Sequence, residues 1–484
     1  MKKFILILML STLGNTVHAQ NQFQSFLSKV DSLATNEAKM AAVDSFMTYA
    51  ATKGFPFIEG DTATFLYRGS SSSVYLSGDM DGWPLPGEAM RNLAGTDLFY
   101  YTHLYEPTAR LDYKFQLNGA TWILDPLNLH QVAGGFGPNS ELAMPQFVQP
   151  WEIAYKPSIL HGATAPLRLF STNMNANYNI TVYLPPGYDT NKTYPVAYFQ
   201  DGGDYINLGS AINILDNLLD SNLIHPVIGV FVTPNNRNVE YAGSARDQYV
   251  AFFAEELVPY IDSHYQTIAQ AASRAVIGDS YGGNISALIS YYHPELFGKC
   301  GLHSGAFQPY NYEAYNLFLN SPPLNVQFAA VWGTYEPLPQ VMHPFRDSLH
   351  DKGYRFEWLE LPEGHSWGLW RHTTAFILEN FFPASVDGVA PIARGTPRGF
   401  RLDQNYPNPF NPTTTIRYEI PKSAHVVLTI ENVLGQEVTR LVDQVEEPGE
   451  KTVQFKATNF PSGVYLCRIF AGAFTDARKM VLVK

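Results

Sequence analysis

A serine stands at the centre of a glycine-rich turn between a strand pattern and a helix pattern. Residues 275–277 are apolar like a short strand, Gly278-Asp279-Ser280-Tyr281-Gly282-Gly283 follows, and residues 285–289 begin an apolar period of helical type. A sharp strand-to-helix turn needs small residues two positions before and after the serine, because Cβ atoms there would collide with the strand and the helix. The turn exposes the serine hydroxyl and points the helix N-terminus at a developing oxyanion. We therefore expect Ser280 to act as a nucleophile.

A nucleophilic serine needs a base, and the base needs a carboxylate that orients it. In a sheet that carries such a turn, the expected order along the chain is serine, acid, histidine. Glu336 comes just after the apolar strand pattern 329–332, and His365 follows the strand pattern 356–361 on a loop that contains Gly364. We expect Glu336 to fix the tautomer of His365, and His365 to take the proton of Ser280.

Other acids and histidines compete for these two roles. The competing histidines are His293, His303, His343, His350 and His372, of which His303 ends a strand pattern at the same predicted edge of the sheet. Asp347 and Asp351 lie on a predicted helix and read as a solvated face, while Glu363 would have to fold back to reach His365.

The oxyanion of such a reaction needs backbone N–H donors. One is expected from Tyr281, the residue after the nucleophile, and another from Gly202 and Gly203 in the loop after the strand pattern 196–199. Asp204 in the same loop is a candidate substrate contact. The alternative for the two glycines is a tight turn without a catalytic role. This chemistry implies neither a metal nor a cofactor.

Composition limits the other classes of function. The 484 residues are 45% hydrophobic and 14% aromatic, which is enough for several packed cores. The formal charge of -12 without a Lys/Arg-rich run argues against a nucleic-acid partner.

Residues 1–19 combine a charged start, an apolar stretch and a small-residue end at Ala19, as a signal peptide does. No later segment is apolar over a length that spans a bilayer. The two cysteines, Cys300 and Cys467, fall in different predicted domains and are expected to be buried thiols.

The pattern along the chain predicts several domains. We expect a helical segment at 20–58, a small β-sandwich at 59–150, a domain of alternating strands and helices at 151–383 with helices at 211–221 and 247–262, a Pro- and Gly-rich linker at 384–399, and an immunoglobulin-like β-sandwich at 400–484.

The C-terminal 85 residues resemble the sorting domain of type IX secretion cargo. The resemblance rests on Asn405-Tyr406-Pro407-Asn408-Pro409-Phe410-Asn411-Pro412, Pro421, Leu434-Gly435-Gln436-Glu437-Val438 and Pro461-Ser462-Gly463-Val464-Tyr465. It implies the type IX secretion machinery as a partner, export across the outer membrane, and either release or attachment to the cell surface.

Residues 151–383 resemble the esterase D and enterochelin esterase family of α/β-hydrolases. The motifs that carry the resemblance are Val182-Tyr183-Leu184-Pro185-Pro186-Gly187-Tyr188, Asp201-Gly202-Gly203, Arg237-Asn238-Val239-Glu240-Tyr241, His293-Pro294-Glu295-Leu296-Phe297 and Ser304-Gly305-Ala306-Phe307. The preceding region, with Gly78-Asp79-Met80-Asp81-Gly82-Trp83 and Arg110-Leu111-Asp112-Tyr113-Lys114-Phe115, is similar to the early-set module of the same proteins, which packs beside the active site. The resemblance implies an exported serine esterase acting on a siderophore-like ester. It also implies that Arg237 contacts an anionic part of the substrate, with an Arg237–Glu240 pair as the structural alternative.

Departures from the family leave alternatives open. Gln308-Pro309-Tyr310 stands where enterochelin esterases carry a Trp pair, which weakens a siderophore assignment, and some members work with a Ser-His dyad that would make Glu336 dispensable. Gly278-Asp279-Ser280 could also be read as the start of a GDSL-type motif. Such a motif should open its domain, whereas several strand patterns precede these residues here, so this interpretation is disfavoured. The rival functions are a feruloyl or acetyl xylan esterase and a non-catalytic glycan-binding protein, for which Trp83, Trp122 and Tyr113 would form a sugar platform. The alternative for these three aromatic residues is a position in the core of the sandwich, where such residues occur more often.

Overall fold

The structure, a computed structural model, describes residues 21–384, 400–402, 405, 408–433, 435–472 and 474–483. The predicted signal peptide and all but the first residue of the predicted linker lie outside these residues. The chain forms two compact units, Met1–Ser385 and Val386–Lys484, and each is described by itself.

Two helices open the first unit. They are α1 (Gln22–Asp31), whose N-cap Asn21 accepts a hydrogen bond from the Gln24 N–H, and α2 (Asn36–Ala51), which Thr35 caps in the same way. Their apolar faces pack on the following strands, because Phe23, Phe26 and Phe46 share a core with residues of those strands. The helical segment predicted from the apolar period is therefore present.

A β-sandwich follows, made of two antiparallel sheets. The first has the order β1-β2-β6-β5, and the second has the order β4-β3-β7-β10-β9 with β8 paired to β7. The bounds are β1 (Phe57–Glu59), β2 (Thr62–Arg68), β3 (Val74–Gly78), β4 (Glu88–Ala89), β5 (Arg91–Asn92), β6 (Leu98–Leu104), β7 (Arg110–Leu117), β8 (Thr121–Ile123), β9 (Gln131–Val132) and β10 (Asn139–Ala143). Alternate apolar residues such as Phe65, Leu111 and Phe115 meet between the sheets.

The largest sheet of the chain carries the candidate site. Its eight strands have the order β11-β12-β14-β13-β15-β16-β17-β18, antiparallel from β11 to β14 and parallel from β14 onward. The bounds are β11 (Ala163–Ser171), β12 (Ala176–Leu184), β13 (Val196–Phe199), β14 (Ile228–Thr233), β15 (Arg274–Asp279), β16 (Lys299–His303), β17 (Gln327–Gly333) and β18 (Phe356–Leu361). The central strands are buried and nearly all apolar, as strands covered on both faces must be.

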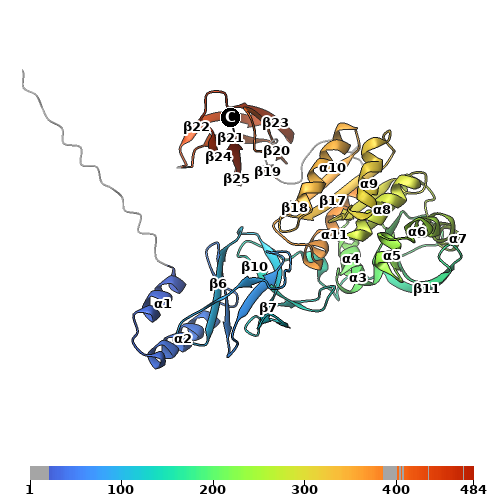
Figure 1. Ribbon diagram of the computed structural model, residues 1–484. Helices are drawn as coiled ribbons and strands as arrows, with labels where there is room; N and C mark the ends of the chain where they lie inside the picture. Colours follow the sequence, from blue (N-terminus) through green and yellow to red (C-terminus); the bar gives the residue numbers. More distant parts are fainter. Residues whose placement is uncertain are drawn as a thin grey trace, which may run out of the picture. The chain divides into compact units, whose positions relative to one another are not determined.

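Helices cover both faces of this sheet (Figure 1). One face carries α6 (Arg246–Ala251), a π-helical turn at Phe252–Leu257, α7 (Val258–His264), α8 (Tyr281–Tyr292), α9 (Pro309–Asn320) and α10 (Pro339–Asp351). The other face carries α3 (Gly202–Asn207), α4 (Ala211–Asp220) and α11 (Trp367–Phe381). Two 3-10 turns (Trp151–Ile153 and Ala271–Ser273) and α5 (Arg237–Tyr241) lie in the connections. The helices predicted at 211–221 and 247–262 are confirmed, with only small differences at their ends.

The second unit is an antiparallel sandwich of two sheets, β19-β20-β23 and β22-β21-β24-β25. The bounds are β19 (Arg401–Leu402), β20 (Thr413–Ile420), β21 (Ala424–Glu431), β22 (Glu437–Glu446), β23 (Gly449–Lys456), β24 (Gly463–Ala471) and β25 (Phe474–Leu482). The predicted fold class, a β-sandwich, an α/β-hydrolase sheet and a second β-sandwich, is confirmed.

Both cysteines are free and buried, as predicted. Burial raises the pKa of the Cys300 thiol to about 12, and it does the same for Cys467. Among the residues that the structure describes, no helix is long and apolar enough to cross a membrane.

Candidate active site

Ser280 lies on the sharp turn that the glycine spacing predicts, between the end of β15 and the start of α8. Its backbone has φ 52° and ψ -117°, a conformation that costs a non-glycine residue about 1–3 kcal/mol. A Cβ added at Gly278 would lie 2.2 Å from the Gly282 carbonyl oxygen, which explains why this position is glycine. The strained turn is held by two backbone bonds, from the Ser280 N–H to the His303 carbonyl (2.8 Å) and from the Ala306 N–H to the Ser280 carbonyl (3.0 Å).

Glu336 and His365 meet in the loops after β17 and β18. The Nδ1 of His365 lies 2.5 Å from Oε2 of Glu336, whose carboxylate is buried. The other oxygen, Oε1, accepts hydrogen bonds from the Ser304 hydroxyl (2.9 Å) and the Gly333 N–H (2.7 Å). Because a carboxylate only accepts, Nδ1 of His365 carries the proton and Nε2 is left as the basic nitrogen.

Two residues that sequence reasoning did not assign complete this arrangement. Ser304 directly follows β16 and donates to Glu336, and the indole Nε1 of Trp370 donates to the Ser304 hydroxyl (3.0 Å). The Trp370 ring also lies edge-on to the His365 ring, with centroids 5.2 Å apart. The Ser304-Gly305 motif was visible in the sequence, but its contact with Glu336 depends on the pairing of β16 with β17.

The electrostatic surroundings of His365 favour its charged form. Burial lowers the pKa of the imidazole, but the hydrogen bond and charge of Glu336 raise it, and the charges of Asp279 and Asp79 add to this. The net pKa lies above the usual histidine value. A base whose pKa is raised takes a proton from serine more readily.

The competing histidines have other partners. His303 is fully buried against the Tyr205 hydroxyl (2.7 Å to Nδ1), and burial lowers its pKa to about 3, so it stays neutral. His293 pairs with Glu295 and His343 with Glu360, each at 2.9 Å. His350 has a 59% exposed side chain. His372 bonds to Glu363, so that carboxylate does not serve His365.

The predicted acids on α10 also lie elsewhere. Asp347 pairs with its neighbour Arg346, and Asp351 has an 84% exposed side chain at the end of the helix. They form the solvated face that the sequence predicts.

The two predicted sources of oxyanion donors adjoin each other. Tyr281 is the first residue of α8, and Gly202 and Gly203 are the first two of α3, where backbone N–H groups lack partners within the helix. A Cβ at Gly282 would lie 3.0 Å from the Asp201 carboxylate, so the two helix starts approach closely. A Cβ at Gly202 would lie 2.2 Å from the Phe231 carbonyl carbon, which shows that packing alone also requires this glycine.

Arg237 is bound by two buried carboxylates. Its Nε donates to Asp201 (2.9 Å), and its Nη2 donates to the carbonyl (2.9 Å) and the carboxylate (3.1 Å) of Asp279. Glu240 instead accepts from the backbone N–H groups of residues 235 and 236, so the alternative Arg237–Glu240 pair is wrong.

Three carboxyl groups surround the Arg237 guanidinium, two of them buried. Burial raises the pKa of both Asp201 and Asp279, and Arg237 counteracts this. Asp204, the third carboxylate, is exposed, and its charge raises the pKa of Asp201 further. One guanidinium therefore faces three carboxyl groups directly beside Ser280.

The sugar platform predicted on the first sandwich is not formed by all three rings. Tyr113 is fully buried and donates to Asp125 (2.7 Å), so its inclusion was wrong; an alternating strand puts every second aromatic residue into the core. Trp83 and Trp122 lie with ring centroids 6.2 Å apart, and Trp122 is 40% exposed.

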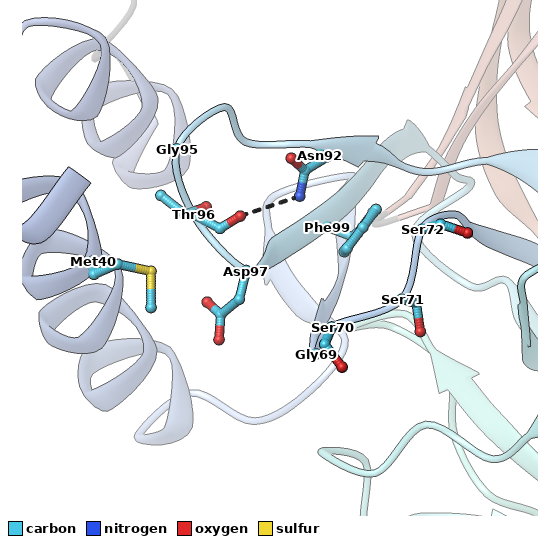
Figure 2. A pocket seen from close by; sticks show the side chains of 10 residues that line it. All are labelled: Met40, Gly69, Ser70, Ser71, Ser72, Asn92, Gly95, Thr96, Asp97 and Phe99. Atoms are coloured by element: carbon cyan, nitrogen blue, oxygen red, sulfur yellow. Dashed lines mark hydrogen bonds between the residues drawn. The ribbon is translucent and has the colours of Figure 1, made fainter.

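A surface hollow of about 450 Å³ lies between α2 and the turns of the first sandwich, away from Ser280 (Figure 2). It is lined by Met40, Gly69, Ser70, Ser71, Ser72, Asn92, Gly95, Thr96, Asp97 and Phe99. Asp97, the charged residue of its lining, binds Arg68, and the Asn92 amide donates to the Thr96 and Leu98 carbonyls. The hollow therefore supplies no chemistry that competes with the turn at Ser280.

Comparison with known proteins assigns two regions to families. Residues 171–374 match the family model described as "Putative esterase", and residues 404–484 match the model of the secretion system C-terminal sorting domain. The esterase match spans strands β12 to β18 of the α/β sheet. The type IX sorting domain indicates secretion or attachment at the cell surface.

Individual relatives match parts of the chain. The chain is 32% identical over 149 residues to the uncharacterized protein YjcH of Bacillus subtilis, covering 30% of this chain and 62% of that protein. It is 27% identical over 245 residues to an endo-1,4-beta-xylanase/feruloyl esterase of Xylanibacter ruminicola, covering 47% of this chain and 32% of that protein. The chain thus spans less than two thirds of either relative.

Among solved structures, the ferric enterobactin esterase of Salmonella typhimurium is similar, with a TM-score of 0.58 and 19% identity. The match covers 66% of this chain and 93% of that one. At this identity the likeness establishes the fold alone.

Proposed function

We propose that the chain is an exported carboxylic-ester hydrolase that works through an acyl-enzyme on Ser280. The observation that carries the proposal is the bond between Glu336 and His365, which leaves Nε2 of His365 as a base at the edge of the sheet where the strained turn presents Ser280. Removal of the Ser280 proton by His365 allows the hydroxyl oxygen to attack the ester carbonyl.

The rest of the cycle uses groups at the same edge. The N–H groups of Tyr281 and of the Gly202-Gly203 turn stabilise the oxyanion, and protonated His365 gives its proton to the leaving alcohol. Water activated by His365 then attacks the acyl-enzyme and releases the acid. Glu336 stays ionised and stabilises the imidazolium during both steps.

The reaction is tested with the Ser280→Ala variant and p-nitrophenyl acetate. We expect the turnover number to fall by roughly 10⁴-fold or more, because the nucleophile is absent. The matched control is Ser290→Ala, which removes a hydroxyl from the same helix α8 together with its bonds to the Ser286 carbonyl and the Cys300 thiol. Undiminished activity in Ser280→Ala, with Ser290→Ala also active, contradicts the proposal.

For the substrate, we propose an uncharged ester linked to carbohydrate, of feruloyl or acetyl type. Arg237 is already bound by the carboxyl groups of Asp201 and Asp279, so its guanidinium is not free to bind an anionic ligand such as a catecholate siderophore. The relative that is an endo-1,4-beta-xylanase/feruloyl esterase supports the same class. The siderophore ester remains the second candidate because its esterases share the fold.

A panel of substrates distinguishes the two candidates. We expect higher kcat/KM on methyl ferulate or acetylated xylan than on free or ferric enterobactin, measured in parallel on the full chain. Preference for enterobactin would contradict the carbohydrate assignment while leaving the esterase mechanism intact.

A further inference from the structure

The loop that carries His365 is held from outside the esterase region, by the first β-sandwich. The N–H of Arg110, at the start of β7, donates to the Pro362 carbonyl (3.1 Å), and Arg110 forms an isolated parallel bridge with Glu363. The hydroxyl of Ser366 donates to Asp79, which follows β3 (3.2 Å). The residues on both sides of His365 are therefore bound to the sandwich.

The fit at this contact is tight. A Cβ added at Gly364 would lie 2.2 Å from Cβ of Asp79, and one added at Gly368 would lie 1.7 Å from Nη1 of Arg110. Real Cβ atoms do not approach other atoms this closely, so both positions must be glycine while the sandwich stays in place. The second glycine lies at the start of α11, just after the His365 loop.

The two sandwich residues are themselves fixed. Asp79 accepts hydrogen bonds from the Trp83 indole (2.9 Å) and the Asp112 N–H (2.8 Å). The Arg110 guanidinium is buried between Asp112 (2.6 Å) and Glu141 (2.7 Å). A side chain that is held by several hydrogen bonds or ion pairs keeps the group it binds in one position, whereas a mobile side chain does not.

A second contact reaches the loop that carries Glu336. The hydroxyl of Tyr335 donates to Glu106 of the sandwich (2.5 Å), and the Tyr335 ring lies 6.2 Å from that of Tyr105. The N–H of Tyr335 also donates to the Glu363 carbonyl (3.1 Å), which joins the two loops. Acid and base are thus both adjacent to residues that the sandwich binds.

We propose that the first sandwich is part of the catalytic machinery, with Asp79 and Arg110 as positioning residues that hold His365 through Ser366 and Pro362. The inference rests on the proposed function of His365 as the base. Asp79 also acts on His365 through its charge, together with Glu336 and Asp279. Asp79 in turn faces Asp112, Arg110 and the Trp83 N–H.

The test compares Ser366→Ala and Asp79→Asn in the full chain, assayed with p-nitrophenyl acetate. Small displacements of a catalytic group cost up to about 10²-fold in rate, so we expect kcat to fall by roughly 10- to 100-fold in Ser366→Ala with KM little changed. The matched control is Ser77→Ala, which removes a part-buried hydrogen bond from β3, the strand that Asp79 follows, to the Pro84 carbonyl and leaves the Ser366–Asp79 bond intact. Its kcat should stay at the wild-type value.

The pH profile separates positioning from general loss of stability. Burial raises the pKa of Asp79 to about 7, so Asp79 is fully charged only above that pH. Asp79→Asn removes this charge, which raises the pKa of His365, so a shift of the acid limb of kcat/KM should be small and toward lower pH, while Ser366→Ala should leave the limb in place. If kcat in Ser366→Ala matches Ser77→Ala, the proposal is overturned, and this holds even if Asp79→Asn does not fold. Failure of the proposed function would look different, since the wild-type chain would then hydrolyse no ester.

Discussion

At the scale of single residues, the Glu336 carboxylate determines which nitrogen of His365 is basic. Both of its oxygens are in use, Oε2 by His365 and Oε1 by Ser304 and the Gly333 N–H. The two donors at Oε1 mean that an amide in this place must turn its oxygen toward them and its NH₂ group toward His365. The NH₂ group would then face Nδ1 and force the proton onto Nε2, where it blocks proton transfer from Ser280.

We therefore expect Glu336→Gln to lower kcat by roughly 10³- to 10⁴-fold without unfolding the chain, measured with p-nitrophenyl acetate. Glu360→Gln is the matched control, because Glu360, on β18, forms a similar carboxylate–imidazole pair with His343 of α10. Activity of Glu336→Gln close to that of the control would favour the Ser-His dyad.

The pKa of His365 predicts the acid limb of the pH profile. The base must be neutral to accept the Ser280 proton, and its pKa lies above the usual histidine value because Glu336 outweighs burial. Activity should therefore fall as the pH drops through a midpoint above about 6.5. A kcat/KM profile whose acid limb lies well below that value would contradict this electrostatic account.

At the scale of elements, the turn from β15 to α8 depends on glycine for steric reasons. The nearest atoms to a Cβ at Gly278 belong to the backbone of Gly282, which cannot move without opening the turn. At Gly203 the nearest atom is the Thr233 hydroxyl oxygen at 3.3 Å, which belongs to a side chain.

We expect Gly278→Ala to destabilise the first unit by about 1–3 kcal/mol or more and Gly203→Ala to cost much less. Thermal unfolding of the two variants gives the comparison. Equal unfolding temperatures would show that the glycine spacing is not a requirement of the turn.

The parts of this site that the sequence predicts are those with local causes. The glycine at 278 reflects a contact within the turn itself, with the Gly282 backbone, and Glu336 and His365 follow apolar strands that end at one edge of a parallel sheet. The roles of Ser304, Trp370 and Asp79 could not be assigned from the sequence. They depend on which strands pair and on how the first sandwich packs against the α/β sheet. The sequence left open whether Tyr113 faces the core or a sugar, because strand alternation does not by itself say which side is solvated, and the structure places it in the core.

At the scale of the whole molecule, the two units carry separate roles. Every residue of the candidate site, including the sandwich residues that hold it, belongs to the first unit, and the sorting domain has its own core. We expect a chain that ends at residue 384 to keep the kcat and KM of the full chain on p-nitrophenyl acetate. A large loss of kcat with intact folding of the first unit would contradict this division. If the chain that ends at residue 384 still reached the cell surface, that result would contradict the role of the sorting domain.

The central claim is that Ser280 is a nucleophile activated by His365. Its most direct test is covalent labelling of the full chain by a fluorophosphonate, followed by peptide mass spectrometry. We predict a single stoichiometric adduct on the peptide that contains Ser280, absent in Ser280→Ala and formed far more slowly in His365→Ala. Lack of any adduct on Ser280 in a folded chain, together with retention on a glycan matrix, would contradict the claim and favour a non-catalytic glycan-binding protein.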